Sequence, residues 1–180
     1  GEGGARHAPI LLNAVELFDG VFVLAGFDFE RARLISTGGE YARTDGADGF
    51  KMKKTLKDMI VQDKKVLVRC DFNVPIDKAG NITDDRRITE ALPTISYLLE
   101  AGAAVILMSH LGRPKGEANP KYSLKPIAEH ISKLLDKEVG FADDDLVTGE
   151  VAKNMAMNLK SGQVMLLQNV RYRSEEEKND

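Results

Sequence analysis

The chain has 180 residues, of which 43% are hydrophobic and 29% are charged, a balance typical of a globular protein. No run approaches the ~18 apolar residues of a membrane span, and the start, GEGGARHAP, lacks the basic and apolar regions of a secretory signal. The net charge of −3 gives no reason to expect nucleic acid as a partner, so any basic site has to be local.

Residues 1–51 differ in composition from the rest. They hold 4 arginines, a single lysine and 9 of the 16 glycines, whereas residues 52–180 hold 14 lysines and 6 arginines. We therefore expect two parts, with 1–51 a segment of unassigned family whose foreign origin, by fusion or extension, is open. Within it, residues 10–18 predict two helical turns, 21–27 (VFVLAGF) a strand, and 38–49 a polar linker. Because an apolar strand left in water promotes aggregation, we expect 21–27 to pack on an open sheet edge of the second part.

The string KVLVRCDFNVP follows. Val66–Val68 predicts a buried strand, and Arg69, Asp71 and Asn73 come next at alternate positions, which share one face of an extended segment. Polar groups at the end of a buried strand have to bond each other or a ligand. Two interpretations are open, a binding site or a structural Arg–Asp pair with a turn at the asparagine. Cys70, the single cysteine, points the other way as a core thiol and fits a reducing cytosol.

The next segment, DDRRITEALPTISYLLEAG, predicts a helix. Thr83 or Asp84 is the expected N-cap, and Gly102 the C-terminal stop. Arg86 and Arg87 fall in the first turn, where the helix dipole opposes cations, so a nearby anion would favour them there. The apolar residues recur at helical spacing: Ile88, Leu92, Ile95, Leu98 and Leu99.

A second buried strand is predicted at 103–108, ending in SHLGRP, and a third at 164–167, ending in QNVRY. Between them, residues 124–137 and 148–160 have helical spacing. The acidic run 143–145 is open to a metal interpretation, but no histidine or further carboxylate pattern follows, so we expect a solvated turn without metal.

This order of strands and helices predicts a doubly wound α/β fold with a parallel sheet. In such sheets ligands bind beyond the carboxyl ends of the strands. All three predicted strands carry polar groups there, and Arg87 opens the helix after the first of them. Several cations at one rim of an acidic protein indicate a site for a small anionic metabolite. The later groups are His110 and Arg113 after the second strand, and Asn169 and Arg171 after the third.

The strings VLVRCDFNVP, DDRRI with ALPTI, SHLGRP and LLQNVRY stand in the order and spacing of the N-terminal domain of phosphoglycerate kinase, which residues 52–180 resemble. The resemblance implies a Rossmann-like sheet, part of the domain that binds 3-phosphoglycerate. It also implies a cytoplasmic enzyme of glycolysis that transfers a phosphoryl group reversibly between ATP and 3-phosphoglycerate.

By the same resemblance, Arg113 and Arg171 would bind the substrate's phosphate, while Asp71 and Asn73 would bond its hydroxyl and acid ends. Arg87 would be catalytic, lying against the carboxylate that is phosphorylated and stabilising the phosphoryl group in transfer. The remaining substrate-binding residues implied are Phe72, His110, Leu111 and Gly112.

The sequence departs from the family in three ways. Gln168 stands where the family usually has glutamate, so a supporting ion pair is expected to be missing. The family's next segment, with a further substrate arginine, does not follow, and neither does the nucleotide domain with its Mg-ATP site. We therefore expect no cofactor in this chain and no activity without a complementary C-terminal half. Two alternatives remain open: a natural or engineered fusion fragment that serves as an interaction or folding unit, and an unrelated α/β module for another phosphorylated acid.

Overall fold

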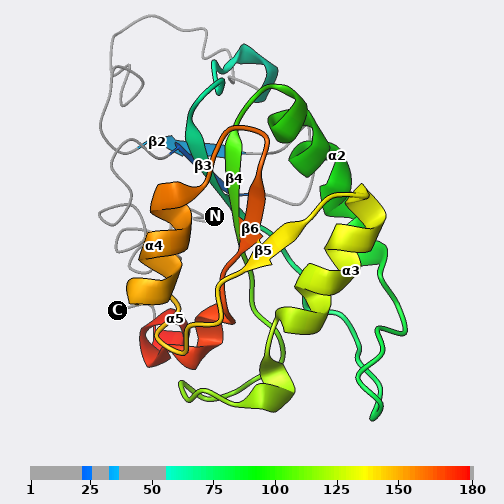
Figure 1. Cartoon of the computed structure of the whole chain (residues 1–180). Helices are drawn as coiled ribbons and strands as arrows, with labels where there is room; N and C mark the ends of the chain where they lie inside the picture. The colour runs from blue at the N-terminus through cyan, green and yellow to red at the C-terminus, as the bar shows by residue number, and fades with distance from the viewer. Residues whose placement is uncertain (1–21, 26–32, 37–55, 179–180) are drawn as a thin grey trace, which may run out of the picture.

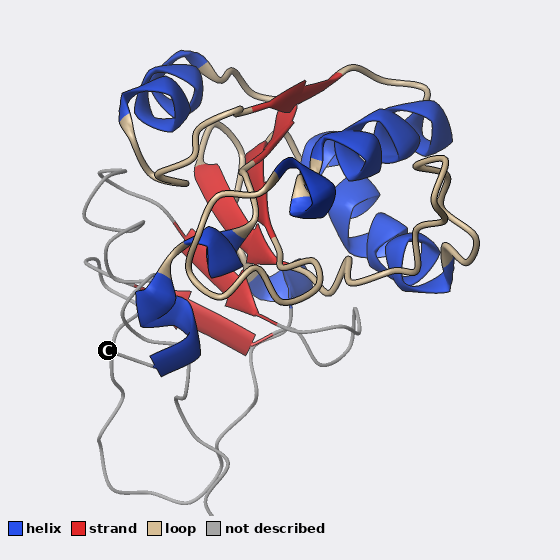
Figure 2. Ribbon diagram, turned by 90° about the horizontal axis from the view of Figure 1, so that it is seen from below, coloured by secondary structure: helices blue, strands red, loops and turns tan. Residues whose placement is uncertain are grey.

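The computed structural model describes residues 22–25, 33–36 and 56–178 (Figure 1). These form a six-stranded sheet in the order β2-β1-β3-β4-β6-β5, with helices on both sides (Figure 2). The predicted helix at 10–18 and linker at 38–49 lie outside the described residues. Within the described part of the chain, no helix combines the length and apolar character needed to cross a membrane.

The centre of the sheet confirms the predicted parallel α/β fold. β3 (Lys65–Arg69) pairs in parallel with β4 (Ala104–Met108), and β4 pairs in parallel with β6 (Val164–Leu166). Every residue of β4 and β6 is buried, because neighbouring strands and helices cover them on all sides. This explains why the strands read as continuous apolar runs rather than as alternating patterns.

One strand of the sheet was not predicted. β5 (Val139–Phe141) pairs in parallel with β6 and forms one margin of the sheet. It has three residues with a glycine in the middle, too few for a hydrophobic period to be recognised. A segment this short becomes a strand because it pairs with a neighbouring strand in the folded protein.

The segment before the second part contributes to the same sheet. β1 (Phe22–Ala25) pairs in parallel with β3, and β2 (Arg33–Ser36) pairs antiparallel with β1. The strand predicted within 21–27 is therefore confirmed for 22–25, together with its place on the open edge of β3. The second strand was not predicted. The domain boundary at residue 51 stays a prediction.

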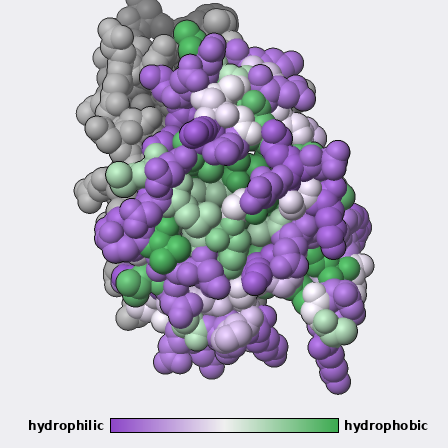
Figure 3. Space-filling view, viewed as in Figure 1, coloured by the Kyte–Doolittle hydropathy of each residue, from purple (hydrophilic) through white to green (hydrophobic). Residues whose placement is uncertain are grey.

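Helices cover the two faces of the sheet. α2 (Arg86–Glu100) and α3 (Lys125–Leu135) pack on one apolar cluster, and α4 (Glu150–Asn158) packs on a second cluster across the sheet. The first cluster includes alternate residues of β3, such as Val66 and Val68, and the second includes Leu67. Alternation along the strand thus divides one apolar run between two cores. Seen from the side of Figure 3, hydrophilic residues surround a hydrophobic area between α3 and α4.

The ends of α2 differ slightly from the prediction. Its N-cap is Asp85, one residue after the expected position, and its side chain caps no backbone N–H of the helix. Asp84 instead accepts a bond of 3.1 Å from the backbone N–H of Arg86. At the other end Gly102 has φ +81° and donates to the Leu99 carbonyl at 3.1 Å, which confirms the predicted stop.

The remaining elements are short. They are η1 (Leu56–Asp58), η2 (Pro120–Tyr122), η3 (Val170–Tyr172) and α5 (Ser174–Lys178). The last two follow β6 directly and pack at the carboxyl ends of the strands (Figure 1).

Candidate functional site

The loops that follow β3, β4 and β6 meet at one rim of the sheet, defined here as residues 70–75, 109–114 and 167–171. They begin with sheet-like bonds: the Cys70 N–H donates to the Met108 carbonyl at 2.9 Å, and the Leu167 N–H to the Leu107 carbonyl at 2.9 Å. Because parallel strands end at the same side, the predicted site residues of three separate sequence stretches lie together. The predicted convergence of Asp71, Asn73, His110, Arg113 and Arg171 at one rim is thus supported by the position of these loops.

Asn169 is the central brace of the rim. It is fully buried, and its Nδ2 donates to the carbonyl oxygens of Leu111 at 2.7 Å and Tyr122 at 2.9 Å. Its Oδ1 accepts from the backbone N–H groups of Leu111 at 3.3 Å and Arg171 at 3.0 Å. One amide therefore ties the loop after β4 to the loop after β6 and satisfies four backbone groups that burial would otherwise leave unpaired.

Gly112 connects all three loops. Its N–H donates to Asn73 Oδ1 at 3.0 Å, and its carbonyl accepts from Arg171 Nη1 at 2.8 Å. It has φ +59°, and a Cβ at this position would lie 2.5 Å from the ring of Tyr122. Only glycine satisfies both the backbone angle and the close approach of the ring. Steric constraints therefore explain the glycine of SHLGRP independently of any ligand.

Asp71 and Arg87 form an ion pair across the rim. Arg87 Nη1 donates to Asp71 Oδ2 at 2.5 Å, while Asp71 Oδ1 accepts from the Asn73 N–H at 3.1 Å. The Arg87 side chain is 53% exposed, so water competes with the pair and its contribution to stability is small. The arginine is held over the rim and remains accessible to a ligand.

Arg113 is exposed, and within the described part of the chain it has no hydrogen-bond or ion-pair partner. It directly follows Gly112, whose two backbone bonds fix the loop. An arginine whose backbone is fixed and whose guanidinium is unpaired within the described residues is well suited to bind an anion from solution.

His110 is half-buried among the charges of the site. Burial lowers its pKa below the ordinary value of 6.5, and the nearby positive charge of Arg171 lowers it further, while the negative charge of Asp71 acts in the opposite direction. The imidazole is consequently neutral at pH 7, with one nitrogen to donate and one to accept. It can contact a hydroxyl or an acid group but adds no positive charge to the rim.

Phe72 and Leu111, the two apolar members of the predicted site, have side chains 0% and 5% exposed. The Phe72 N–H donates to Ser109 Oγ at 2.8 Å, and the backbone of Leu111 is bonded to Asn169. These two residues hold the loops in place and offer a ligand almost no accessible surface. Their direct contact with a substrate stays a prediction.

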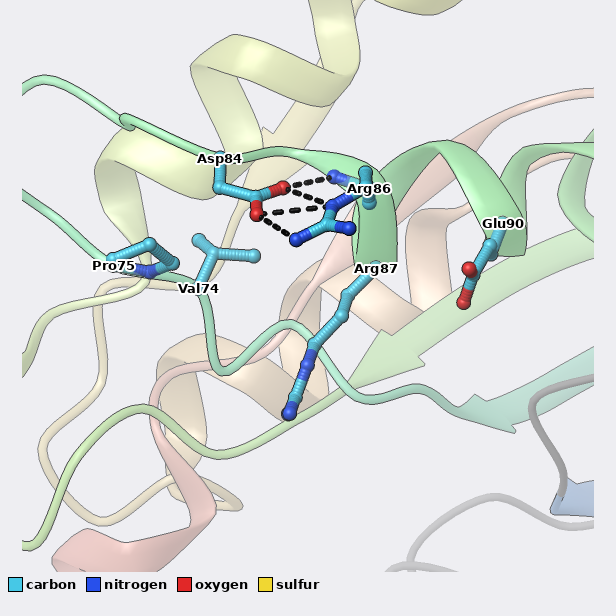
Figure 4. A pocket seen from close by; sticks show the side chains of 6 residues that line it. All are labelled: Val74, Pro75, Asp84, Arg86, Arg87 and Glu90. Carbon is cyan, nitrogen blue, oxygen red and sulfur yellow. Dashed lines mark hydrogen bonds and ion pairs between the residues drawn. The ribbon is translucent and has the colours of Figure 1, made fainter.

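An open hollow of about 250 Å³ lies beside Arg87, at the start of α2 (Figure 4). Arg86 is engaged there by Asp84, with Nη2 to Oδ2 at 2.6 Å, and this pairing lowers the Asp84 pKa to about 2. Arg87 points away from the Asp84–Arg86 pair (Figure 4). The hollow is lined by Val74 and Pro75 of the rim together with Asp84, Arg86, Arg87 and Glu90, so it adjoins the rim directly.

Arg69 has a different partner from the one that the sequence suggested. Its Nη2 is paired with Glu176 of α5, not with Asp71, and the two side chains are only 16% and 6% exposed. Glu176 is the middle glutamate of the run SEEEKND. Three consecutive glutamates give no pattern that would mark the middle position, and only the fold places Glu176 inside.

Gln168, where the family's ion pair was expected to be missing, is held by hydrogen bonds instead. Gln168 is 2% exposed, and its Oε1 accepts from the backbone N–H groups of Leu124 at 3.1 Å and Asn169 at 2.9 Å. Its Nε2 donates to Ser123 Oγ at 3.2 Å and Asp143 Oδ1 at 3.3 Å. The neutral amide is fully satisfied, since it can accept and donate at once whereas a carboxylate only accepts.

Two of the three aspartates at 143–145, Asp143 and Asp144, accept internal hydrogen bonds. Asp144 is 8% exposed and accepts from the N–H groups of Leu146 at 3.0 Å and Ala152 at 3.2 Å, so it fixes the turn before α4 rather than lying in solvent. Among the described residues, no three or more His, Cys, Asp or Glu side chains gather in a way that could hold a metal ion. Cys70 is buried, as predicted, and burial raises its pKa to about 12.

Comparison with known proteins places these features in a family. A family model described as phosphoglycerate kinase matches residues 56–180. Phosphoglycerate kinase of Clostridium novyi (strain NT) is 60% identical over 128 residues, which cover 71% of this chain and 32% of that protein. Phosphoglycerate kinase of Clostridium perfringens (strain SM101 / Type A) is 59% identical over 127 residues, with the same coverage of 71% and 32%.

Two solved structures agree. The phosphoglycerate kinase of Pyrococcus horikoshii OT3 superposes with a TM-score of 0.60 and 36% identity over 67% of this chain and 28% of that one. The enzyme from Coxiella burnetii superposes with a TM-score of 0.56 and 37% identity over 66% and 28%. The chain spans about a third of the length of the curated relatives that it matches.

Proposed function

The chain belongs to the phosphoglycerate kinase family, and on this premise we propose that its rim binds 3-phosphoglycerate. The observation that supports the proposal most is the set of direct bonds from Gly112 to Asn73 and Arg171, which join the loops after three strands. The cations at this rim suit a ligand that carries both a phosphate and a carboxylate.

We assign the phosphate to Arg113 and Arg171. Arg171 uses Nη1 to hold the Gly112 carbonyl, so its remaining guanidinium donors are available to a phosphate oxygen. Arg113, unengaged and one residue from Gly112, supplies the second charge. The hydroxyl and acid ends of the substrate then fall to Asp71, Asn73 and the neutral His110.

Arg87 is the proposed catalytic residue. In this structure it is paired with Asp71, which holds it at the rim without removing it from solvent. During transfer, negative charge spreads over the phosphoryl group, and a guanidinium beside the accepting carboxylate stabilises that charge more than it stabilises the bound substrate.

We propose that the complete reaction is reversible phosphoryl transfer between ATP and 3-phosphoglycerate, a step of glycolysis, and that it takes place in the cytoplasm. We infer that this chain supplies the acid-substrate half of the site and that a complementary C-terminal half has to supply the nucleotide half.

Titration calorimetry with 3-phosphoglycerate tests the proposal. We expect saturable binding that weakens as salt is raised, because phosphate and carboxylate are held by charge. Glycerol 3-phosphate, which lacks the carboxylate, should bind more weakly. A chain that is folded by circular dichroism and shows no saturable heat with 3-phosphoglycerate at millimolar concentrations would contradict the proposed function.

Complementation tests the need for a second half. Mixed with a C-terminal half of a relative, the chain should regain turnover, while neither part should turn over alone. If binding occurs but turnover does not return, the alternative of a fusion or folding fragment without catalysis gains support. One observation favours that alternative: β1 and β2 lie outside the family match yet extend its sheet.

A further inference from the structure

A five-residue helix, α5, begins three residues after Arg171. A helix this short is not stable by itself in water, so contacts with the rest of the protein have to hold it. Its first residue, Ser174, packs so closely on Gly116 that a Cβ at Gly116 would lie 2.8 Å from the Ser174 Cβ. The Gly116 N–H also donates to the Arg171 carbonyl at 3.1 Å. The helix and the proposed phosphate ligand therefore rest on the same turn.

The second attachment of α5 is the buried pair between Glu176 and Arg69, which we call the clasp. The Glu176 side chain is 6% exposed, so its charge depends on Arg69 rather than on water. In the described part of the chain Arg69 has no second carboxylate, and its Nη1 is buried without a partner. Losing Glu176 would leave the guanidinium with no compensation, which buried charges tolerate poorly.

The neighbouring pair provides a contrast. Glu175 is paired with Arg173 at 2.7 Å, but both side chains are 39% exposed and the pair lies two residues apart within one turn. It joins nothing distant in the sequence. The clasp, by comparison, joins α5 to the end of β3 over 107 residues.

We propose that Glu176 is a positioning residue, which through the clasp holds α5 against the end of β3 and so fixes Arg171 in the rim. The inference rests on the proposed function for the ligand, but the position of Arg171 can be tested without it. The backbone of Arg171 is held on one side by Asn169 and on the other by the Gly116 turn on which α5 packs. Without the clasp the second support weakens, and the guanidinium loses its fixed distance to Gly112.

Hydrogen exchange tests this without ligand. Glu176→Gln should speed exchange of the Gly116 amide, which donates to Arg171, by about tenfold or more, while the Cys70 amide between β3 and β4 stays protected. Glu175→Gln, a matched change on the same helix, should leave the Gly116 amide as in the wild type. Equal exchange in the Glu176→Gln and Glu175→Gln variants would overturn the proposal.

A double-mutant cycle with 3-phosphoglycerate then shows whether Glu176 acts through Arg171. Glu176→Gln should raise the Kd by about fivefold in the wild type and leave it unchanged in an Arg171→Ala background. The same loss in both backgrounds would show that Glu176 acts elsewhere and would overturn the assignment. If the wild type does not bind, the proposed function fails, and hydrogen exchange still decides the role of Glu176.

Glu176→Asp keeps the experiment decisive should the amide variant fail to fold. It preserves the charge and shortens the side chain by one methylene, so the clasp should loosen without leaving Arg69 uncompensated. Exchange at Gly116 should rise at least twofold, less than in Glu176→Gln. Wild-type exchange in Glu176→Asp, with Glu176→Gln unfolded, would overturn the proposal.

Discussion

Two sets of polar side chains meet at the rim, and they differ in burial. Asn169 and Gln168 are 0% and 2% exposed, and their amides bond on both the donor and the acceptor side. Arg87 and Arg113 are exposed: Arg87 has one carboxylate partner, and Arg113 has none within the described residues.

The difference in burial separates side chains that stabilise the fold from side chains that can bind a ligand. A buried amide that satisfies several backbone groups determines where the loops run, and its loss is felt as instability. An exposed arginine contributes little to folding and is free to meet an anion. Substitutions in the first set should therefore act on the free energy of unfolding, and those in the second on ligand affinity.

The largest effect is expected for Asn169→Ala. The change would leave four backbone groups without partners, two buried at Leu111 and two half-buried at Tyr122 and Arg171, and should lower the free energy of unfolding by about 3 kcal/mol. Urea denaturation measures it. Asn119→Ala is the control, since that exposed side chain caps only η2 and should cost about 1 kcal/mol. Equal losses of unfolding free energy in the Asn169→Ala and Asn119→Ala variants would contradict the role of Asn169 in joining the loops.

Gly112→Ala should come next. The new methyl group would lie 2.5 Å from the Tyr122 ring, and alanine would also have to adopt a φ of +59°. The clash and the backbone strain together should lower the free energy of unfolding by about 2–4 kcal/mol. Gly80→Ala separates the two causes, because Gly80 has φ +88° but no atom within 4 Å of an added Cβ. Its cost should be limited to about 1–2 kcal/mol of backbone strain. A cost at Gly80 equal to that at Gly112 would remove the argument from close packing.

The exposed arginines should show the opposite behaviour. Arg113→Ala should weaken 3-phosphoglycerate binding by about 1.5–3 kcal/mol, or one to two decades in Kd, because the phosphate keeps only Arg171. The free energy of unfolding should change by no more than about 0.5 kcal/mol. Arg87→Ala should weaken binding less, since its proposed role grows in the transition state.

Calorimetry on these two variants and on Arg86→Ala checks the ordering. Arg86 is paired with Asp84 at the hollow, and its loss should leave the Kd unchanged. If Arg87→Ala abolished binding while Arg113→Ala left it intact, the assigned roles would be wrong.

The smallest expected effect concerns pH. The folded pKa of Cys70 is about 12, above its ordinary value of 9.0, because burial and the charge of Asp71 disfavour the thiolate. The stability that comes from the neutral thiol is therefore complete below about pH 9 and is lost as the pH rises toward 12. At pH 10 the loss should be about 1 kcal/mol. Urea midpoints at pH 8 and pH 10 for the wild type and Cys70→Ala measure it, and parallel changes in both proteins would contradict the effect.

Much of the fold could be predicted because the signals were local. Val66–Val68 and Ala104–Met108 are apolar throughout, which identified them as buried strands. The apolar residues of α2 and α3 recur at helical spacing, which identified the helices. β5 escaped because three residues around a glycine carry no period. The candidate site could be located because parallel strands end at one rim, a rule that depends on topology and not on side-chain detail.

The sequence by itself determined the parallel α/β order, which follows from the pattern of apolar residues. It also determined the rim that carries Asp71, Asn73, Arg113 and Arg171, because parallel strands all end on the same side. Only the tertiary structure decided the partners. Arg69 could have met Asp71, two residues away, but is paired with Glu176 on another element. Gln168 was expected to lack the family's ion pair, and its neutral amide makes four hydrogen bonds. A charge or an amide finds its partner by distance in space, and side chains 107 residues apart become neighbours only once the sheet has brought them together.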